Sequence, residues 1–305
     1  MNELEVLQPA LAGYELIDCG DGAKLERFGN RVVARPEPQA LWKPSLPPEE
    51  WARLADATFF RDGRSEERGE WKLKPGAPER WTMEYSHGPM RLRMRLALTG
   101  FKHVGVFPEQ AANWDFIYDT VLEMRRGESD TIPKVLNLFA YTGGATLAAR
   151  AAGAGVTHVD SVKQTVGWAR DNAALSGLED EARDGAVRWI VDDALKFARR
   201  EVRRENLYDG MILDPPAYGR GPDGEKWVLA EGLDEMLSLG ARLLRPRGFL
   251  VLNLYSMGLS AIVARTAVHA RFGPPPPLQE QLGELAFTDR AGKQLPLGVF
   301  YRFRR

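Results

Sequence analysis

The feature that most constrains the fold is the alternation of short apolar runs with longer amphipathic stretches after Pro133. Five apolar runs are candidate strands, at residues 134–139, 156–160, 187–191, 210–214 and 248–254. Four helical stretches separate them, centred on residues 147–152, 166–175, 194–205 and 229–243. Continuous apolar strands between amphipathic helices are typical of a parallel sheet that is covered on both faces. We therefore expect an α/β fold in this part of the chain.

The remaining segments predict a β-rich beginning and an antiparallel ending. Near the start, two alternating runs flank Asp21-Gly22, a residue pair typical of hairpin turns, and "MRLRMRLAL" alternates arginine with apolar residues. The polar stretch at residues 61–81 is expected to be a loop, and a helix is expected from Pro108. The runs "LGELAFTD" and "LPLGVFYRFRR" predict a terminal antiparallel pair. We expect a smaller β-rich domain at residues 1–104, a candidate substrate-binding or RNA-binding module, and an α/β domain at residues 105–305.

Composition restricts the classes of function. The 305 residues carry a formal net charge of −1, so any contact with nucleic acid needs a local patch rather than a global field. A single cysteine, Cys19, excludes an internal disulfide and fits a reducing compartment. The first twenty residues lack a signal pattern, and no apolar run reaches membrane-spanning length. We expect a cytoplasmic protein with no membrane contact and no metal site, and the oligomeric state is left open.

Small and acidic residues follow the predicted strands at their carboxyl ends, where open α/β sheets bind ligands. The first strand leads into Gly143 and Gly144, whose missing side chains let a ligand approach the backbone. The second ends in Asp160, placed to accept both ribose hydroxyls of a nucleoside. The third ends in Asp192 and Asp193, where a carboxylate can accept from the amino group of adenine. Asp193 is equally suited to be a helix N-cap. Together these positions favour a nucleoside cofactor.

The motifs of phosphate-bearing cofactors are absent. The sequence holds no G-x-x-x-x-G-K-[ST] motif, and "TGGATLA" lacks the spacing of G-x-G-x-x-G. Acidic groups repel phosphates but suit a cation. S-adenosylmethionine carries a sulfonium, an adenosine and an amino acid but no phosphate, so it fits this lining better than a nucleotide does.

Several segments resemble the successive motifs of class I S-adenosylmethionine-dependent methyltransferases. They are "VLNLFAYTGGATLAA", "THVDSVKQTVGWARDNAALSGL", "WIVDDALKFARRE" and "MILDPPAYGRGP". Together with "GVFPEQAANW", they resemble more narrowly the branch that contains large-subunit ribosomal RNA methyltransferases. The resemblance covers roughly residues 100–305. It implies a Rossmann-like sheet that is mostly parallel, with an antiparallel C-terminal strand.

The resemblance also implies roles for individual residues. It places Asp160 on the cofactor ribose, Asp192 or Asp193 on adenine, and the turn at residues 141–144 beside the methionine moiety. The residues expected to bind the cofactor are Phe107, Gln110, Asn137, Tyr141, Thr142, Gly143, Gly144, Asp160, Ser161, Asp192, Asp193, Ala194 and Asp214.

The segment "ILDPPAYGRGP" is the candidate catalytic element. Two prolines hold Asp214, Pro215 and Pro216 in extended geometry, and we expect their carbonyls to be free to accept. A carboxylate beside a fixed carbonyl suits the two hydrogens of an amine, which favours in-line methyl transfer to nitrogen. Tyr218 is placed to stack on a planar substrate. Ala217 separates the prolines from this aromatic residue, unlike the amine-methylating pattern, so the turn could instead serve only as an anchor.

Two neighbouring features bear on the same chemistry. The glycine-rich stretch at residues 219–224 is expected to be a loop that closes over the substrate. The predicted fifth strand contains no cysteine, so methylation of carbon through a thiolate adduct is not expected. Asn253 and Tyr255 at the end of that strand either line the pocket or simply form a polar strand end.

A local basic patch offers a surface for ribosomal RNA. Its members are Lys72, Lys74, Arg80, Arg91, Arg93 and Arg95, interleaved with Trp71, Trp81 and Tyr85. Such groups bind phosphates and stack on bases. The alternative is a solvent-facing strand whose arginines pair with Glu70, Glu79 and Glu84. The sequence thus predicts a methyltransferase acting on a base of ribosomal RNA, with nitrogen favoured. The alternative is a methyltransferase acting on a small molecule or a protein with the same cofactor domain.

Overall fold

The computed structural model describes residues 4–63, 67–126, 131–179, 186–255, 258–276 and 279–305. Contacts divide the chain into two compact units, which we describe separately. Unit 1 comprises Met1–Leu7, Ala112–Leu285 and Gly298–Arg305, and unit 2 comprises Gln8–Ala111 and Ala286–Leu297. The division into domains at residues 1–104 and 105–305 stays a prediction.

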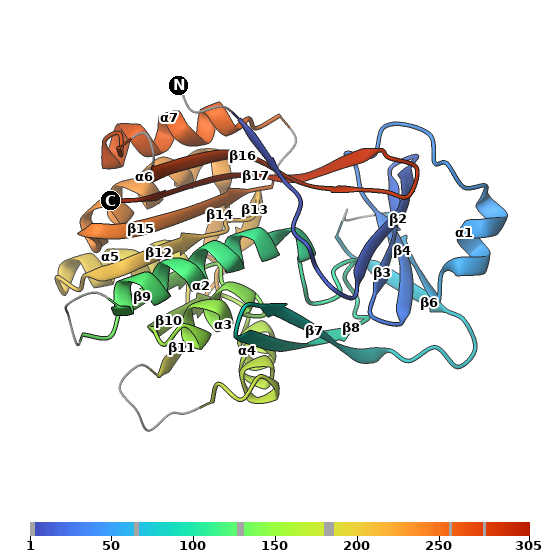
Figure 1. Ribbon diagram of the computed structural model, residues 1–305, viewed down its shortest axis with the longest axis horizontal. Coiled ribbons are helices and arrows are strands. Elements are labelled where there is room, and N and C mark those ends of the chain that lie inside the picture. Colours follow the sequence, from blue (N-terminus) through green and yellow to red (C-terminus); the bar gives the residue numbers. More distant parts are fainter. Residues whose placement is uncertain (1–3, 64–66, 127–130, 180–185, 256–257, 277–278) are drawn as a thin grey trace. The chain divides into compact units, whose positions relative to one another are not determined.

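Unit 1 is built on an eight-stranded sheet with the order β1-β16-β17-β15-β12-β9-β10-β11 (Figure 1). The strands are β1 (Glu5–Leu7), β9 (Lys134–Leu138), β10 (Gly155–Asp160), β11 (Val187–Val191), β12 (Tyr208–Leu213), β15 (Leu244–Leu254), β16 (Glu280–Thr288) and β17 (Gln294–Arg304). The last residues of β16 and the first of β17 belong to unit 2. Strands β15, β12, β9, β10 and β11 pair in parallel, whereas β17 runs antiparallel to β15. The predicted mostly parallel sheet with an antiparallel C-terminal strand is therefore confirmed. Pairing of β1 with β16 was not predicted.

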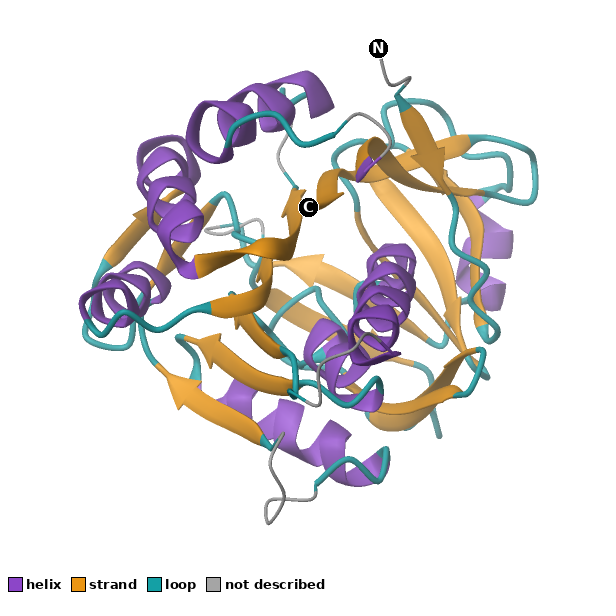
Figure 2. Cartoon of the chain, turned by 60° about the vertical axis from the view of Figure 1, so that its left-hand side comes forward, coloured by secondary structure: helices purple, strands orange, loops and turns teal. Residues whose placement is uncertain are grey.

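Helices cover both faces of this sheet (Figure 2). They are α2 (Ala111–Arg126), α3 (Gly144–Ala151), α4 (Lys163–Leu175), α5 (Ala194–Arg203), α6 (Leu229–Leu243) and α7 (Ala261–Phe272). Fully buried side chains of the strands, such as Leu136 and Met211, pack with Phe197 of α5 and Met236 of α6 in one apolar core. The four predicted helices of the α/β region are confirmed, and α7 was missed.

The strand order places a topological switch point between β9 and β12. From β9 the chain moves outward through β10 to β11, and from β12 it moves the other way to β15. In open α/β sheets such a reversal leaves a crevice outside the carboxyl ends of the strands, where ligands bind. The residues that follow β9, β10, β11 and β12 are therefore gathered along one edge of the sheet.

Unit 2 holds a five-stranded sheet, β2-β3-β4-β5-β6, and a two-stranded sheet, β7-β8. Its elements are β2 (Tyr14–Gly20), β3 (Ala23–Phe28), β4 (Arg31–Pro36), α1 (Pro48–Leu54), β5 (Ala57–Arg61), β6 (Gly69–Leu73), β7 (Arg80–His87), β8 (Met90–Ala97) and a 3-10 turn (Pro108–Gln110). The predicted hairpin turn at Asp21-Gly22 is confirmed, with φ of 49° and 73°. The loop expected at residues 61–81 is partly wrong, because β6 pairs with β5 there and places Trp71 opposite Phe59. Such cross-strand packing outweighs a polar composition.

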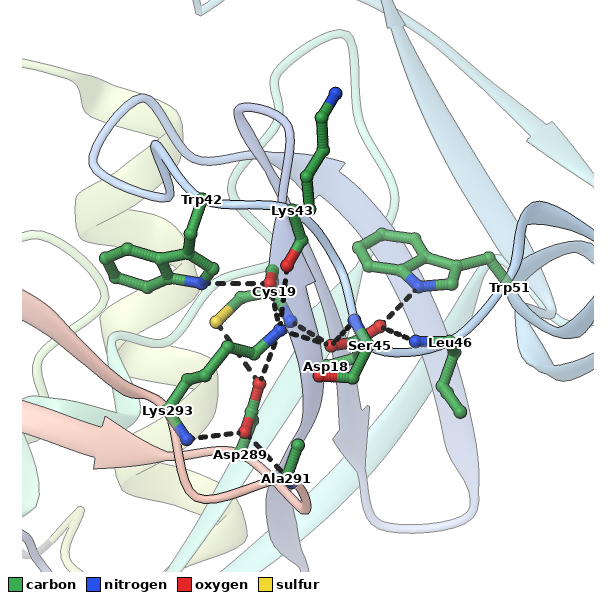
Figure 3. Close-up of polar contacts among 10 residues, drawn as sticks. All are labelled: Asp18, Cys19, Trp42, Lys43, Ser45, Leu46, Trp51, Asp289, Ala291 and Lys293. Atoms are coloured by element: carbon green, nitrogen blue, oxygen red, sulfur yellow. Dashed lines mark hydrogen bonds and ion pairs between the residues drawn. The ribbon is translucent and has the colours of Figure 1, made fainter.

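A polar cluster in unit 2 joins the tip of the β16–β17 pair to β2 (Figure 3). The buried Asp18 carboxylate accepts hydrogen bonds from the backbone N–H groups of residues 45–46 and from the indole of Trp51. Lys293 Nζ lies 3.0 Å from Asp18 Oδ1 and 3.3 Å from Asp289 Oδ2. A buried carboxylate with this many donors is satisfied as a charged group, so the cluster stabilises the fold of this unit.

Candidate functional site

The loop after β9 has a constrained backbone. Phe139 and Tyr141 have φ of 58° and 49°, in the left-handed region that residues other than glycine rarely adopt. Asp160, at the end of β10, accepts hydrogen bonds from the N–H groups of Tyr141 and Val162, each at 2.9 Å. Burial nevertheless raises the pKa of this carboxyl. Asp160 thus holds two neighbouring strand-end loops together.

The two glycines of this loop have a packing role that the sequence reasoning missed. Gly143 has a φ of 92°, and a Cβ added there would lie 3.1 Å from the Cβ of Ala169 in α4. A Cβ on Gly144 would lie 2.5 Å from the ring of Trp114 in α2. The missing side chains therefore let α4 and the Trp114 ring approach the turn, which is a different reason from the expected approach of a ligand.

Asn137 and Thr142, both expected to bind the cofactor, are buried and have partners inside unit 1. Asn137 Nδ2 donates to Thr146 Oγ1 at 2.9 Å, and Asn172 Nδ2 donates to the Thr142 carbonyl at 3.0 Å. His158 Nδ1 lies 2.9 Å from the same Thr146 hydroxyl. Burial lowers the pKa of His158 to about 3, so this side chain is neutral. The contacts of Thr146 tie β9 and β10 to α3, and that of Asn172 ties the loop after β9 to α4.

The two carboxylates after β11 differ in what they bind. Asp193 is the N-cap of α5, because its Oδ1 accepts from the N–H of Lys196 at 2.8 Å. Asp192 uses both oxygens, Oδ1 for the N–H of Asp193 and Oδ2 for an ion pair with Arg200. Within the described ranges, Asp193 Oδ2 has no hydrogen-bond partner. Ala194 is buried in the first turn of the helix.

Three further residues are expected at the cofactor. Ser161 directly follows Asp160 at the end of β10. Phe107 and Gln110 belong to unit 2, where the ring of Phe107 packs 4.9 Å from that of His103 and Gln110 is buried. Their position near the cofactor stays a prediction.

The turn after β12 brings Asp214 next to a residue from the neighbouring strand. Asn253 Nδ2, in β15, donates to Asp214 Oδ1 at 2.7 Å. Burial raises the pKa of Asp214 to about 6, although this hydrogen bond opposes the shift. Pro215 is buried and Pro216 is exposed. The carbonyl of Pro216 accepts from Trp227 Nε1 at 2.7 Å, so the expectation that both proline carbonyls are free is wrong for Pro216.

The expected glycine-rich loop is a short hairpin. Strand β13 (Tyr218–Arg220) pairs antiparallel with β14 (Lys226–Val228). Lys196 Nζ lies 2.8 Å from Asp223 and 3.1 Å from Glu225, which ties the hairpin turn to α5. Tyr218, at its start, is 53% exposed and so available for stacking. Closure of this segment over a substrate stays a prediction.

The predicted basic patch lies in unit 2 and involves both of its sheets. Arg91 and Arg93 of β8 are exposed while the residues between and after them are buried, so the predicted alternation is confirmed. Arg93 forms an exposed ion pair with Glu84 at 2.8 Å. Lys72 and Lys74 are also exposed, in β6 and directly after it. Pairing with glutamate is therefore present for Arg93, as the alternative interpretation expects.

The strand ends present an acceptor-rich lining. Asp160, Asp193 and Asp214 follow three different strands at the same edge of the sheet. Carboxylates at this edge suit hydroxyl and amino donors and a cationic group, and they repel phosphates. This set of acceptors therefore fits the adenosine and sulfonium of S-adenosylmethionine.

None of the described helices combines the length and apolar character needed to cross a membrane.

Comparisons with known proteins bear on the family and the fold of this chain. A family model described as S-adenosylmethionine-dependent methyltransferase matches residues 35–272. The crystal structure of a SAM-dependent methyltransferase from Agrobacterium tumefaciens is 36% identical, with a TM-score of 0.86 over 100% of this chain and 96% of that one. SMU.776, solved in complex with SAH, shares the fold at 16% identity, with a TM-score of 0.68 over 95% of this chain and 75% of that one.

A curated relative extends the comparison over a shorter stretch. Ribosomal RNA large subunit methyltransferase K/L of Shewanella frigidimarina is 30% identical over 163 residues. The match spans 53% of this chain and only 21% of that protein.

Proposed function

The chain belongs to the family of S-adenosylmethionine-dependent methyltransferases, and from this premise we propose that it methylates a base nitrogen of RNA, with ribosomal RNA as the favoured substrate. The observation that carries the choice of nitrogen is the environment of Asp214. This carboxyl follows β12 at the switch point, and burial raises its pKa to about 6. A group with such a pKa is charged at neutral pH and still accepts a proton readily.

The proposed reaction is an in-line displacement. The lone pair of the base nitrogen forms the new C–N bond as the bond from the methyl carbon to sulfur breaks, and neutral S-adenosylhomocysteine leaves. The nitrogen becomes positively charged and loses a proton, which Asp214 accepts. Alignment of the reacting atoms is worth on the order of 7–11 kcal/mol in such reactions. The rigid Pro215–Pro216 turn supports this alignment because it restricts the backbone next to the carboxylate.

For the cofactor, we propose that Asp160 accepts from the ribose hydroxyls and Asp193 from the adenine amino group. The support for Asp193 over Asp192 is its Oδ2, which has no hydrogen bond among the described residues, whereas Asp192 Oδ2 is held by an ion pair with Arg200. The turn at residues 141–144 is assigned to the methionine moiety. The cofactor supplies the methyl group, and these residues hold and orient it.

RNA is proposed as the substrate from two observations. The Shewanella relative is named as acting on ribosomal RNA of the large subunit. Exposed arginines stand on one face of β8 in unit 2. A small molecule or a protein remains the alternative acceptor, because the same cofactor site serves either substrate.

The test measures transfer of labelled methyl groups to ribosomal RNA from a strain lacking the gene and from the wild type. We expect more label in RNA from the deletion strain, since wild-type RNA is already modified. The Asp214→Asn variant is expected to lose transfer. Asp209→Asn is the matched control, because it changes a carboxylate at the opposite end of the same strand. Label in an RNA-free extract, with none in either RNA, would contradict the RNA proposal.

A further inference from the structure

Resting on this proposed function, we infer that Trp227 is a positioning residue that couples the acceptor turn to the cofactor loop. Trp227 lies in β14 and is 3% exposed. Its place in the sequence indicates no role, since it follows the polar turn "GPDGEK" and belongs to none of the family motifs. The indole N–H of Trp227 makes a polar contact with the turn after β12, and its ring makes an apolar contact with the loop after β9.

The first contact is polar and fixes the acceptor turn. Trp227 Nε1 donates to the carbonyl of Pro216 at 2.7 Å. Pro216 has no N–H and its side chain is exposed, so its carbonyl is the polar group that it offers to the rest of unit 1. The next residue is held as well, because the Ala217 carbonyl accepts from the N–H of Leu229 at 3.0 Å. A short hydrogen bond from a buried indole therefore sets the height of the Asp214–Pro216 turn above the sheet.

The second contact is apolar and reaches the cofactor loop. The ring of Trp227 lies 4.8 Å from that of Phe139, with an interplanar angle of 53°. Phe139 has a φ of 58°, and it begins the loop that Asp160 holds through the N–H of Tyr141. A residue in this strained conformation persists only where its surroundings hold it, and the indole is one of those surroundings.

A glycine of α6 gives the indole its room. On the other side, Gly219 stands opposite Trp227 in the hairpin register, where an added Cβ would make only ordinary contact with the tryptophan, at 3.8 Å. A Cβ on Gly232, in α6, would lie 2.6 Å from Cζ3 of the indole, closer than real Cβ atoms approach. Gly232 of α6 therefore limits where the ring can lie. A larger side chain at this position should shift both the turn after β12 and the loop after β9.

The consequence concerns the rate of transfer rather than affinity for the cofactor. The turn carries the acceptor side of the reaction, and the loop after β9 carries the donor side. A misplacement of about 1 Å between reacting groups can cost about 100-fold in rate. Because one rigid side chain contacts both segments, it fixes their separation.

The test uses Trp227→Phe, which keeps an aromatic ring against Phe139 and removes the N–H. We expect affinity for S-adenosylhomocysteine, measured by calorimetry, to stay within about twofold of wild type. The single-turnover rate of methyl transfer should fall by about 10-fold to 100-fold. Hydrogen exchange should accelerate in the peptide covering residues 217–221 and stay unchanged in the one covering residues 139–143. The matched control is Trp42→Phe, which removes an indole hydrogen bond of 3.0 Å to the Cys19 carbonyl in unit 2.

A second variant, Gly232→Ala, displaces the ring without removing its hydrogen bond. We expect slower transfer and faster exchange in both peptides. Unchanged exchange at residues 217–221 in Trp227→Phe would overturn the inference, as would a wild-type rate. Equal losses of affinity and rate would also overturn it, because they indicate general loosening. The exchange and calorimetry arms need no RNA, so a wrong RNA substrate leaves them readable, and the rate is then measured on whichever extract fraction accepts label.

Discussion

Asn253 Nδ2 and Asp214 Oδ1 lie 2.7 Å apart across the neighbouring strands β15 and β12. The bond stabilises the charged form of Asp214, whereas burial opposes it and raises the pKa to about 6. Asn253 Oδ1 is buried and has no hydrogen bond within the part of the chain that the structure describes. A rotated amide would present this oxygen to a protonated Asp214, so the pair is suited to both states of the carboxyl.

The first prediction is a pH dependence of methyl transfer. If the charged form of Asp214 accepts the proton, the single-turnover rate falls as the pH drops below about 6, the pKa of this group. Asn253→Leu removes the hydrogen bond that lowers this pKa, so the pKa rises and the acidic limb moves to higher pH. We expect a movement of about one to two pH units, since a hydrogen bond to a charged group is worth about 1.5–3 kcal/mol. An acidic limb at the same pH in both proteins would argue against Asp214 as the proton acceptor.

The second prediction concerns the ribose contact. Asp160→Ala should weaken binding of S-adenosylhomocysteine by about 10-fold to 100-fold, because the variant removes the hydrogen bonds to a carboxylate. The Tyr141 N–H loses its partner as well, which adds to the effect. Calorimetry measures the change, with Asp209→Asn as a control that alters a carboxylate at the other end of the sheet. Unchanged affinity in Asp160→Ala would remove this residue from the site.

The third prediction separates the two carboxylates after β11. Asp193→Ser keeps an N-cap side chain but removes Oδ2, so stability should change by a few tenths of a kcal/mol while cofactor affinity falls about tenfold. Asp192→Asn should change affinity less, because its oxygens already bind Arg200 and a backbone N–H. The opposite order of affinities would transfer the adenine contact to Asp192.

The fourth prediction tests the arginine row for RNA binding. Replacing Arg91 and Arg93 together with alanine should weaken RNA binding. It should also flatten the dependence of log affinity on log salt, by about one unit for each phosphate that the protein no longer neutralises. Arg53→Ala is the control, since it removes an exposed arginine of α1 that pairs with Glu50. If the double variant keeps the wild-type salt dependence, these arginines do not bind phosphates. The strand face is then only solvated, and Arg93 serves to pair with Glu84.

The fifth prediction concerns acid stability of unit 2. Burial alone would raise the pKa of Asp18, but hydrogen bonds from Ser45, Leu46, Trp51 and Lys293 outweigh it and lower the pKa below its ordinary value. The stability from this charge is therefore fully present above the unfolded pKa of about 4, and it is lost as the pH falls through the lower folded value.

Denaturant unfolding at several pH values measures this effect. Asp18→Asn should lower the free energy of unfolding by about 2–4 kcal/mol at neutral pH, because it leaves buried donors and Lys293 poorly compensated. The variant should also lose less stability than wild type between about pH 5 and pH 3. Parallel acid curves for the two proteins would show that Asp18 is not the group responsible.

Much of the sheet could be predicted because its signals are local. Each central strand is a continuous apolar run, and each helix has its own amphipathic period, so neither depends on distant partners. Strand β1 carries no such signal, since three residues become a strand only by pairing with β16, far along the chain. The helix α7 was missed because its pattern of apolar residues is weak. Pairing with β5 likewise turned the polar stretch around β6 into a strand.

The sequence by itself determined the five central strands and the four helices between them, the carboxylates at the strand ends and the class of cofactor they suit. Residue type and spacing carry that information, and the chain must obey it locally. Only the tertiary structure decided which of those polar groups are already engaged. Asp193 caps a helix, the Pro216 carbonyl accepts from Trp227, and Asn137 binds Thr146. Hydrogen bonds between distant residues depend on three-dimensional placement, because many partners are compatible with the same spacing and packing selects one.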